Sequence, residues 1–108
     1  MKITEKEIRV VRDSKIWFDE YWVNIEIFIN DKWIHPYFIK EEISDWHEPR
    51  TTMNPTEANM KEYLKKQFNL INELLDKDYT LASYDKFKEI VHRYHNPSEY
   101  EPTVVYLL

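Results

Sequence analysis

Apolar and polar residues alternate through the first third of the chain. Between Trp17 and Ile29 the odd positions carry an apolar series that only Asp19 interrupts: Trp17, Tyr21, Val23, Ile25, Ile27 and Ile29. An alternation of period two places every second side chain on the same face of a β-strand. The pattern therefore predicts a strand over residues 16–29. A strand of this length is unusual, so we expect a bend or bulge near Asp19 and Glu20.

A second alternating segment, residues 33–39, follows the pair Asn30–Asp31. Asn and Asp tolerate the left-handed backbone conformation better than other non-glycine residues, so this pair is predicted to close a two-residue hairpin turn. A three-residue loop would instead shift the register by one and exchange the faces of the second strand. A turn that closes at Ile29 opposite Lys32 predicts these cross-strand pairs: Phe28 with Trp33, Ile27 with Ile34, Glu26 with His35, Asn24 with Tyr37 and Val23 with Phe38.

Two further strands are predicted at the ends of the chain. Residues 6–12 alternate in the same way and precede a turn expected at Asp13–Ser14, which makes a three-stranded meander over about residues 6–39. The apolar segment 103–107 is predicted to join this sheet, because an apolar terminal strand is normally buried by pairing.

The second half of the chain is predicted to be helical. Residues 40–53 show no sustained period and contain Pro49, so they are expected to form a loop. Asn54 is expected to be the N-cap of a helix over residues 55–77, with Pro55 at its first position. A second helix is predicted over residues 84–95. The whole pattern predicts an α+β fold: a three- to four-stranded antiparallel meander sheet packed with two helices.

Composition limits the functions that this chain can have. A length of 108 residues is that of one domain, and the chain contains no cysteine and no glycine. Phosphate-binding loops and nucleophile elbows need glycine, so we expect no nucleotide-dependent chemistry and no cofactor. No apolar run is long enough to span a membrane and no leader is recognisable, so we expect a cytoplasmic protein without a membrane partner.

Charge and aromatic content indicate a binding surface. The net charge is −5, and residues 41–108 hold thirteen acids against eight Lys or Arg. Such a surface repels phosphates, so direct nucleic-acid binding is disfavoured. Trp and Tyr are enriched at the energetic centres of protein interfaces. The expected interface consists of an acidic segment with its tryptophan (Glu41, Glu42, Asp45, Trp46 and Glu48) and of the non-core sheet face (Trp22, Trp33 and Tyr37).

Candidate catalytic groups are few. A carboxylate opposite an imidazole, as predicted for Glu26 and His35, could orient a general base, but a solvated cross-strand pair has the same signature. His47 between acidic residues could begin a metal site, which would need three or four convergent ligands. We expect no metal and no catalytic residues.

The sequence thus favours a small acidic module that binds another protein. The short acidic chain fits an inhibitor or an antagonist of the immunity or anti-defence type. Such a protein would occlude a basic surface of its partner, of the kind that can bind nucleic acid. Two alternatives stay open. One is a small hydrolase or metal-dependent enzyme that uses Glu26, His35 and His47, and the other is a homodimeric structural module.

Overall fold

The computed structural model describes residues 2–40, 42–83, 85–86, 89 and 103–107. These residues trace one α-helix and eight strands after a short 3-10 helix, η1. The elements are η1 (Glu5–Glu7), β1 (Ile8–Trp17), β2 (Glu20–Ile29), β3 (Lys32–Ile34), β4 (Tyr37–Lys40), β5 (Glu42–His47), β6 (Arg50–Met53), α1 (Glu57–Asp76), β7 (Thr80–Ala82) and β8 (Thr103–Leu107). The protein is therefore α+β, as predicted.

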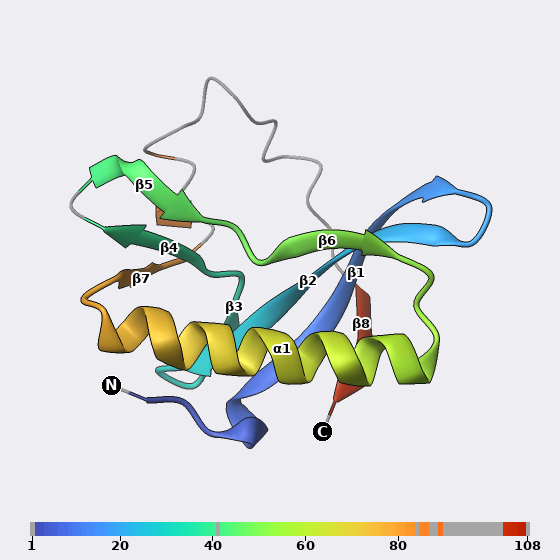
Figure 1. The fold of residues 1–108 in the computed structure, drawn as a ribbon, viewed down its shortest axis with the longest axis horizontal. Coiled ribbons are helices and arrows are strands. Elements are labelled where there is room, and N and C mark those ends of the chain that lie inside the picture. Colours follow the sequence, from blue (N-terminus) through green and yellow to red (C-terminus); the bar gives the residue numbers. More distant parts are fainter. Residues whose placement is uncertain (1, 41, 84, 87–88, 90–102, 108) are drawn as a thin grey trace.

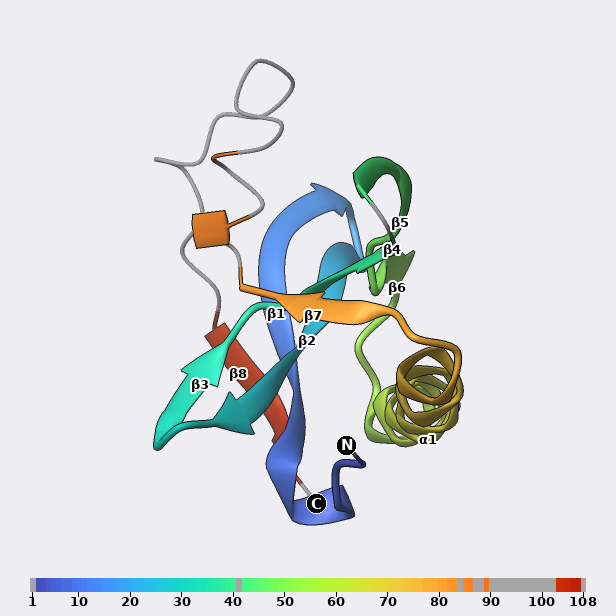
Figure 2. The same ribbon diagram turned by 90° about the vertical axis from the view of Figure 1, so that its left-hand side faces the viewer.

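The strands form two antiparallel sheets. The larger sheet has the order β3-β2-β1-β8, and β6 pairs with β2 beside β3. The smaller sheet has the order β5-β4-β7. α1 crosses in front of the larger sheet in Figure 1, and Figure 2 shows the helix end-on at one side of the strands. The predicted terminal strand over 103–107 is confirmed, because β8 pairs with β1.

The hairpin between β2 and β3 has the predicted turn and register. Asn30 and Asp31 both have positive φ, at 54° and 62°, which is the geometry of a tight hairpin turn with the twist of the adjoining strands. Ile29 lies opposite Lys32, and the next two predicted pairs also form. The ladder ends at Ile34, so the three remaining predicted pairs are wrong: Glu26 with His35, Asn24 with Tyr37 and Val23 with Phe38.

Pro36 explains why the predicted strand over 33–39 is divided. Proline has no backbone N–H and cannot continue the ladder. The chain leaves the larger sheet after Ile34 and enters the smaller one at Tyr37. The place beside the first half of β2 is taken by β6, whose Thr51 lies opposite Val23. The predicted loop over residues 40–53 is thus wrong, because it contains β5 and β6.

The first turn of the sheet lies at Phe18–Asp19 and not at Asp13–Ser14. The strand predicted over 16–29 is therefore two strands, and β1 is longer than the predicted 6–12 segment. The register of β1 against β2 slips between Arg12 and Lys15, so β1 has an extra residue there and bulges. The turn-forming pair Asp13–Ser14 is used in this irregularity.

α1 begins two residues later than predicted. Thr56 is the N-cap, since its backbone is extended and its Oγ1 accepts a hydrogen bond from the Asn59 backbone N–H at 3.2 Å. An extended Thr56 excludes Pro55 from the helix. Asn54 contributes its carbonyl oxygen instead, which accepts from the Thr56 N–H at 2.8 Å. The second predicted helix, over 84–95, lies for the most part outside the described residues.

The main core lies between α1 and one face of the larger sheet. The apolar alternation of β1 and β2 supplies the sheet side, and α1 supplies the other. The buried members include Ile8, Val10, Val23, Ile25, Ile27, Phe38, Met60, Tyr63, Leu64, Ile71 and Leu74. No helix within the described ranges is long and apolar enough to cross a membrane.

Candidate functional site

The face of the larger sheet opposite the core carries stacked arginine and tryptophan side chains. Arg9 on β1 lies opposite Glu26 on β2, and its Nη2 and Nε both donate to Glu26 Oε1, at 2.6 and 2.8 Å. The Arg9 guanidinium also lies 4.1 Å from the centre of the Trp33 ring. On the same face, the Arg50 guanidinium lies 4.3 Å from the Trp22 ring. Trp22 and Trp33, two of the three predicted interface tryptophans, are therefore each covered in part by an arginine.

This sheet face is largely buried. Trp22 and Trp33 are half-buried. Tyr37, which was expected on this face, lies instead on β4 of the smaller sheet and is only 2% exposed. Asn24 and Glu26 are also buried. A buried charge needs a partner, and the bidentate Arg9 pair provides one for Glu26. The interface role of Trp22, Trp33 and Tyr37 stays a prediction, but a partner would meet the edges of two half-buried rings there.

His35 is enclosed between the two sheets. It is 4% exposed, its Nδ1 lies 3.3 Å from the Ile25 carbonyl oxygen, and its ring meets Tyr37 edge-on at 5.1 Å. Burial lowers the pKa of His35 to about 4, and the positive charge of Arg50 acts in the same direction. A neutral imidazole with its proton on Nδ1 donates to Ile25. A pKa this low is poorly matched to general-base catalysis near neutral pH.

The enzymatic alternative required Glu26, His35 and His47 to act together. Glu26 binds Arg9, while His47 is exposed on β5 of the other sheet with its ring 5.3 Å from that of Tyr79. Across the described part of the chain, no group of three or more His, Asp or Glu residues is placed to hold a metal ion. These three residues therefore do not form a shared centre in the described geometry.

The described part of the predicted acidic segment lies on β5 and directly after it, and β5 pairs with β4. Glu42, Asp45 and Trp46 belong to β5, which is an edge strand of the smaller sheet, and Trp46 pairs with Ile39. Glu48 follows the strand, is half-buried and lies 3.9 Å from the Arg50 Nη1. Glu41 is outside the described residues. The segment thus contributes the edge strand of the smaller sheet.

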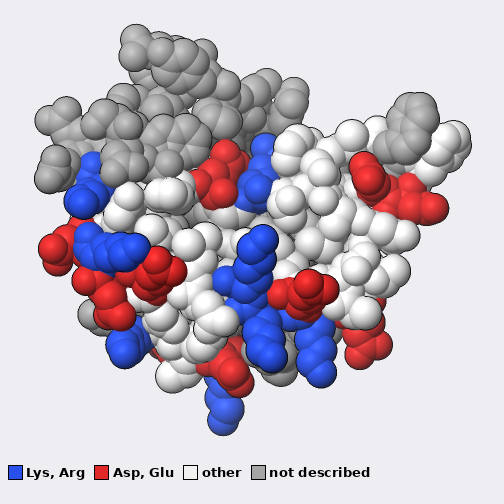
Figure 3. Space-filling view, in the orientation of Figure 1, with Lys and Arg blue, Asp and Glu red and all other residues white. Residues whose placement is uncertain are grey.

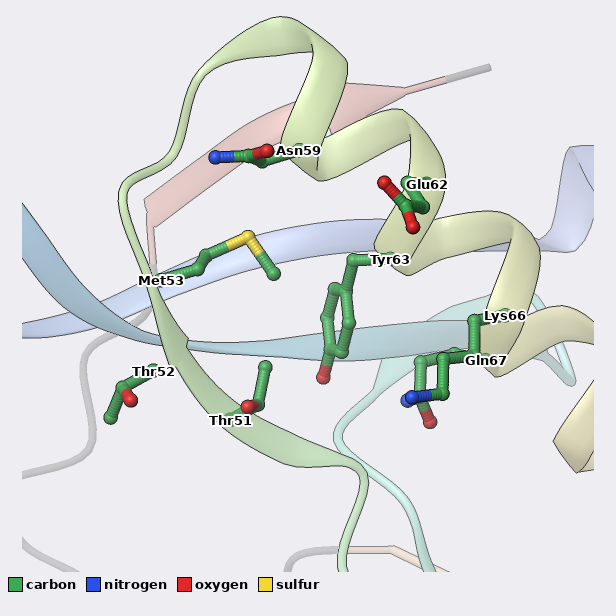
Figure 4. Close-up of a pocket in the computed structure, with 8 residues that line it drawn as sticks. All are labelled: Thr51, Thr52, Met53, Asn59, Glu62, Tyr63, Lys66 and Gln67. Atoms are coloured by element: carbon green, nitrogen blue, oxygen red, sulfur yellow. The ribbon is translucent and has the colours of Figure 1, made fainter.

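A groove between β6 and the first half of α1 was not predicted from the sequence. Its volume is about 370 Å³. Figure 4 shows the side chains of Tyr63 and Gln67 reaching from α1 toward β6. The groove is lined by Thr51, Thr52, Met53, Asn59, Glu62, Tyr63, Lys66 and Gln67.

Gln67 is the unusual member of the groove. It is 9% exposed, and its Oε1 is buried and accepts no hydrogen bond from the described residues. An unsatisfied buried acceptor costs about 1–3 kcal/mol of stability. Gln67 also lines a second, smaller cavity of about 90 Å³. The sequence held one signal for this position, a polar residue on the helix stripe between Leu64 and Ile71.

Tyr63 closes the floor of the groove. Its hydroxyl donates a hydrogen bond to the Pro49 carbonyl oxygen. Burial, with the nearby negative charge of Glu48 as a smaller cause, raises the pKa of Tyr63 above its ordinary value. The phenol therefore stays protonated and holds the connection between β5 and β6 against α1.

The tip of the β1–β2 hairpin is the most exposed apolar part of the described chain. Phe18 is 75% exposed and Ile16 is 42% exposed, and no other large hydrophobic residue is exposed among those whose side chains the structure describes. Figure 1 shows this hairpin projecting from the body of the molecule. Asp19 and Glu20, both exposed, adjoin Phe18. The tip combines an aromatic side chain with two carboxylates.

Comparisons with models of known protein families, with curated proteins and with solved structures give no match. A function is therefore inferred from the geometry of the chain itself.

Proposed function

We propose that this protein is a non-enzymatic binding module that docks on a basic surface of a partner protein. Its role is that of an inhibitor or immunity-type antagonist, which occludes a surface of the kind that binds nucleic acid. The observation that carries the proposal is the acidic, apolar tip of the β1–β2 hairpin, defined by residues 16–20.

The apolar residues of the tip support docking on a protein. Removing a Phe side chain from water is worth about 1.5–3 kcal/mol, and Phe18 keeps three quarters of its surface in water. Most of this free energy is therefore still available to stabilise a complex with a partner. A projecting aromatic residue can enter a pocket of a partner with little loss of conformational entropy, because its side chain has only two rotatable bonds.

The charges of the tip support a basic partner. Residues 13–20 contain three acids and one lysine, which gives a formal charge of −2. Figure 3 shows red side chains beside the projecting hairpin, whereas both signs alternate over α1. Complementary charge accelerates association and selects against partners with acidic surfaces.

Binding kinetics with the purified partner test this proposal. The partner is first captured from the native cell and then immobilised. Phe18→Ser should raise the dissociation rate about tenfold or more, which corresponds to about 1.4 kcal/mol, because an anchor acts on the lifetime of a complex. Asp19→Asn with Glu20→Gln should slow association roughly threefold to tenfold at low salt and reduce its salt dependence.

A matched pair of charge variants provides the control. Glu73→Gln with Asp76→Asn removes the same charge at the C-terminal end of α1, which lies at the other end of the molecule from the hairpin in Figure 1. This control should leave association unchanged. Equal kinetics for the tip variants and the wild type would reject the tip as the docking site. If Phe18→Ser instead converts a dimer of the protein to a monomer in sedimentation, the tip pairs with a second copy and the homodimer alternative replaces the proposal.

A further inference from the structure

The groove between β6 and α1 presents both signs of charge on its helix side. Glu62 and Lys66 both line the groove, and both are exposed. They are four residues apart on α1, so their Cβ atoms are neighbours at about 5–6 Å. Within the described residues no ion pair joins them, whereas Lys77 and Glu73, at the same spacing, pair at 2.8 Å. The carboxylate and the ammonium group are therefore both available to a ligand.

Gln67 adds a hydrogen-bond donor to the same wall. The residue is only 9% exposed. Its Oε1 is buried, whereas its amide nitrogen is directed toward the groove (Figure 4). An amide nitrogen carries two N–H groups, and no acceptor in the described part of the chain bonds to those of Gln67. The ligand group that fits here is an acceptor, and the adjacent ammonium of Lys66 favours a carboxylate.

Stability alone does not explain a glutamine at this position. The buried Oε1 has no donor among the described residues, and an unsatisfied buried acceptor lowers the stability of the folded state. Position 67 lies on the buried stripe of α1 between Leu64 and Ile71, where an apolar side chain of similar length would avoid this loss. A polar residue that lowers stability beside a groove is typical of a binding position.

The opposite wall and the floor of the groove are suited to an apolar group. Met53 on β6 is half-buried, and the buried Tyr63 of α1 lies between the two walls. The Tyr63 hydroxyl already donates to the Pro49 carbonyl oxygen, so the ring is what this residue contributes to the groove. A volume of about 370 Å³ lies within the ordinary range for small-molecule sites. The lining thus combines one anion, one cation and an apolar surface.

We infer that this groove binds a free apolar α-amino acid in its zwitterionic form. The carboxylate of the ligand accepts hydrogen bonds from Lys66 Nζ and the Gln67 amide nitrogen, and its ammonium group donates to Glu62. The two charges of an α-amino acid are attached to one carbon, which suits charges one helical turn apart. The apolar side chain packs against Met53 and Tyr63. This site is separate from the docking proposed for the hairpin tip, and either can fail without the other.

A titration followed by NMR tests the inference. The probe is L-leucine, and two analogues each lack one of its charges: isocaproate has no ammonium group, and isoamylamine has no carboxylate. With leucine we expect saturable shifts of the backbone amides of residues 51–53 and of the Gln67 side-chain amide. Each analogue should bind at least about tenfold more weakly. The inference is overturned if leucine gives no saturable shift at millimolar concentration, or if either analogue binds equally well.

Substitutions on the helix wall provide the second arm. Gln67→Met removes the donor, Lys66→Met removes the cation, and each should weaken leucine binding about tenfold. Gln67→Met should leave the thermal midpoint unchanged or raise it, because the unsatisfied acceptor is removed as well. Lys65→Met is the matched control, since it removes the same charge from an exposed position of α1 outside the groove. Equal losses for Lys65→Met and Lys66→Met would reject the site.

Glu62 distinguishes a zwitterion from a simple carboxylate. Glu62→Gln removes the partner of the ammonium group, so it should weaken leucine binding about tenfold without weakening that of isocaproate. If Glu62→Gln binds leucine as well as the wild type or better, the ammonium group is not held there and the inference is wrong. Variants at Phe18 should leave these titrations unchanged, so failure here is distinct from failure of the proposed function.

Discussion

Acidification should destabilise this protein through His35, and the structure sets the size of the effect. The ring is 4% exposed and its surroundings favour the neutral form, because burial lowers the pKa from an ordinary value of 6.5 to about 4. The hydrogen bond to the Ile25 carbonyl opposes this shift without cancelling it. In the unfolded chain the same imidazole is in water and has its ordinary pKa.

The sign follows from the number of protons that each state binds. Between pH 6.5 and about 4 the unfolded chain holds a proton on His35 and the folded chain does not. The contribution of His35 to the free energy of unfolding is therefore fully present above pH 6.5 and decreases as the pH falls through this window. Below about pH 4 the protonation of His35 causes no further loss of stability. A difference of about 2.5 pH units at 1.36 kcal/mol each gives a loss of roughly 3 kcal/mol.

Urea unfolding between pH 8 and pH 4 measures this loss. His35→Gln removes the titrating group and keeps a side-chain N–H for the Ile25 carbonyl, so most of the pH dependence in this window should disappear. The wild type, measured in the same buffers, is the reference. Equal slopes for the wild type and His35→Gln, or an NMR titration that places the His35 pKa near 6.5, would refute the reasoning.

Two stability predictions concern other parts of the fold. Thr56→Ala should cost about 1 kcal/mol in urea melts because it removes the N-cap acceptor, and Asn54→Ala should cost clearly less, since Asn54 acts through its backbone carbonyl. The opposite order would mean that the helix begins at Asn54. Arg9→Met should cost about 2 kcal/mol because it leaves the buried Glu26 carboxylate without its ion pair, and adding Glu26→Leu should recover much of this loss. Independent, additive costs in this double-mutant cycle would show that the pair is not coupled.

Local patterns predicted those parts of the fold in which neighbouring residues determine the geometry. The alternation of β2 and the tolerance of Asn30 and Asp31 for positive φ are properties of adjacent residues, so the hairpin and its first three pairs were predicted correctly. The apolar stripe of α1 is also a local pattern, and it predicted the helix. Its start was misplaced because Asn54 and Thr56 are both good caps, and only the extended backbone of Thr56 decides between them.

The sites depend on contacts that no local pattern contains. His35 was expected beside Glu26, but Pro36 directs the chain into a second sheet, where His35 is buried. β6 has only four residues and is held by its pairing with β2, so its segment was expected to be a loop. The exposed tip was not predicted, because β1 has a bulge at Asp13–Ser14 where a turn was expected. The chain turns at Phe18–Asp19 instead, and Phe18 is largely exposed there. Of these features, β6 depends on pairing with a segment distant in the sequence, and the tip depends on the register between β1 and β2.

The central claim, that the hairpin tip docks on a basic partner, is tested most directly by position-specific cross-linking in the native cell. A photo-reactive phenylalanine analogue replaces Phe18 in one variant and Asn69, an exposed residue of α1, in the other. We predict that position 18 cross-links one basic protein in stoichiometric amount, that position 69 does not, and that Asp19→Asn with Glu20→Gln sharply reduces the product. The same proteins from both positions, or a product insensitive to the loss of the two carboxylates, would contradict the claim.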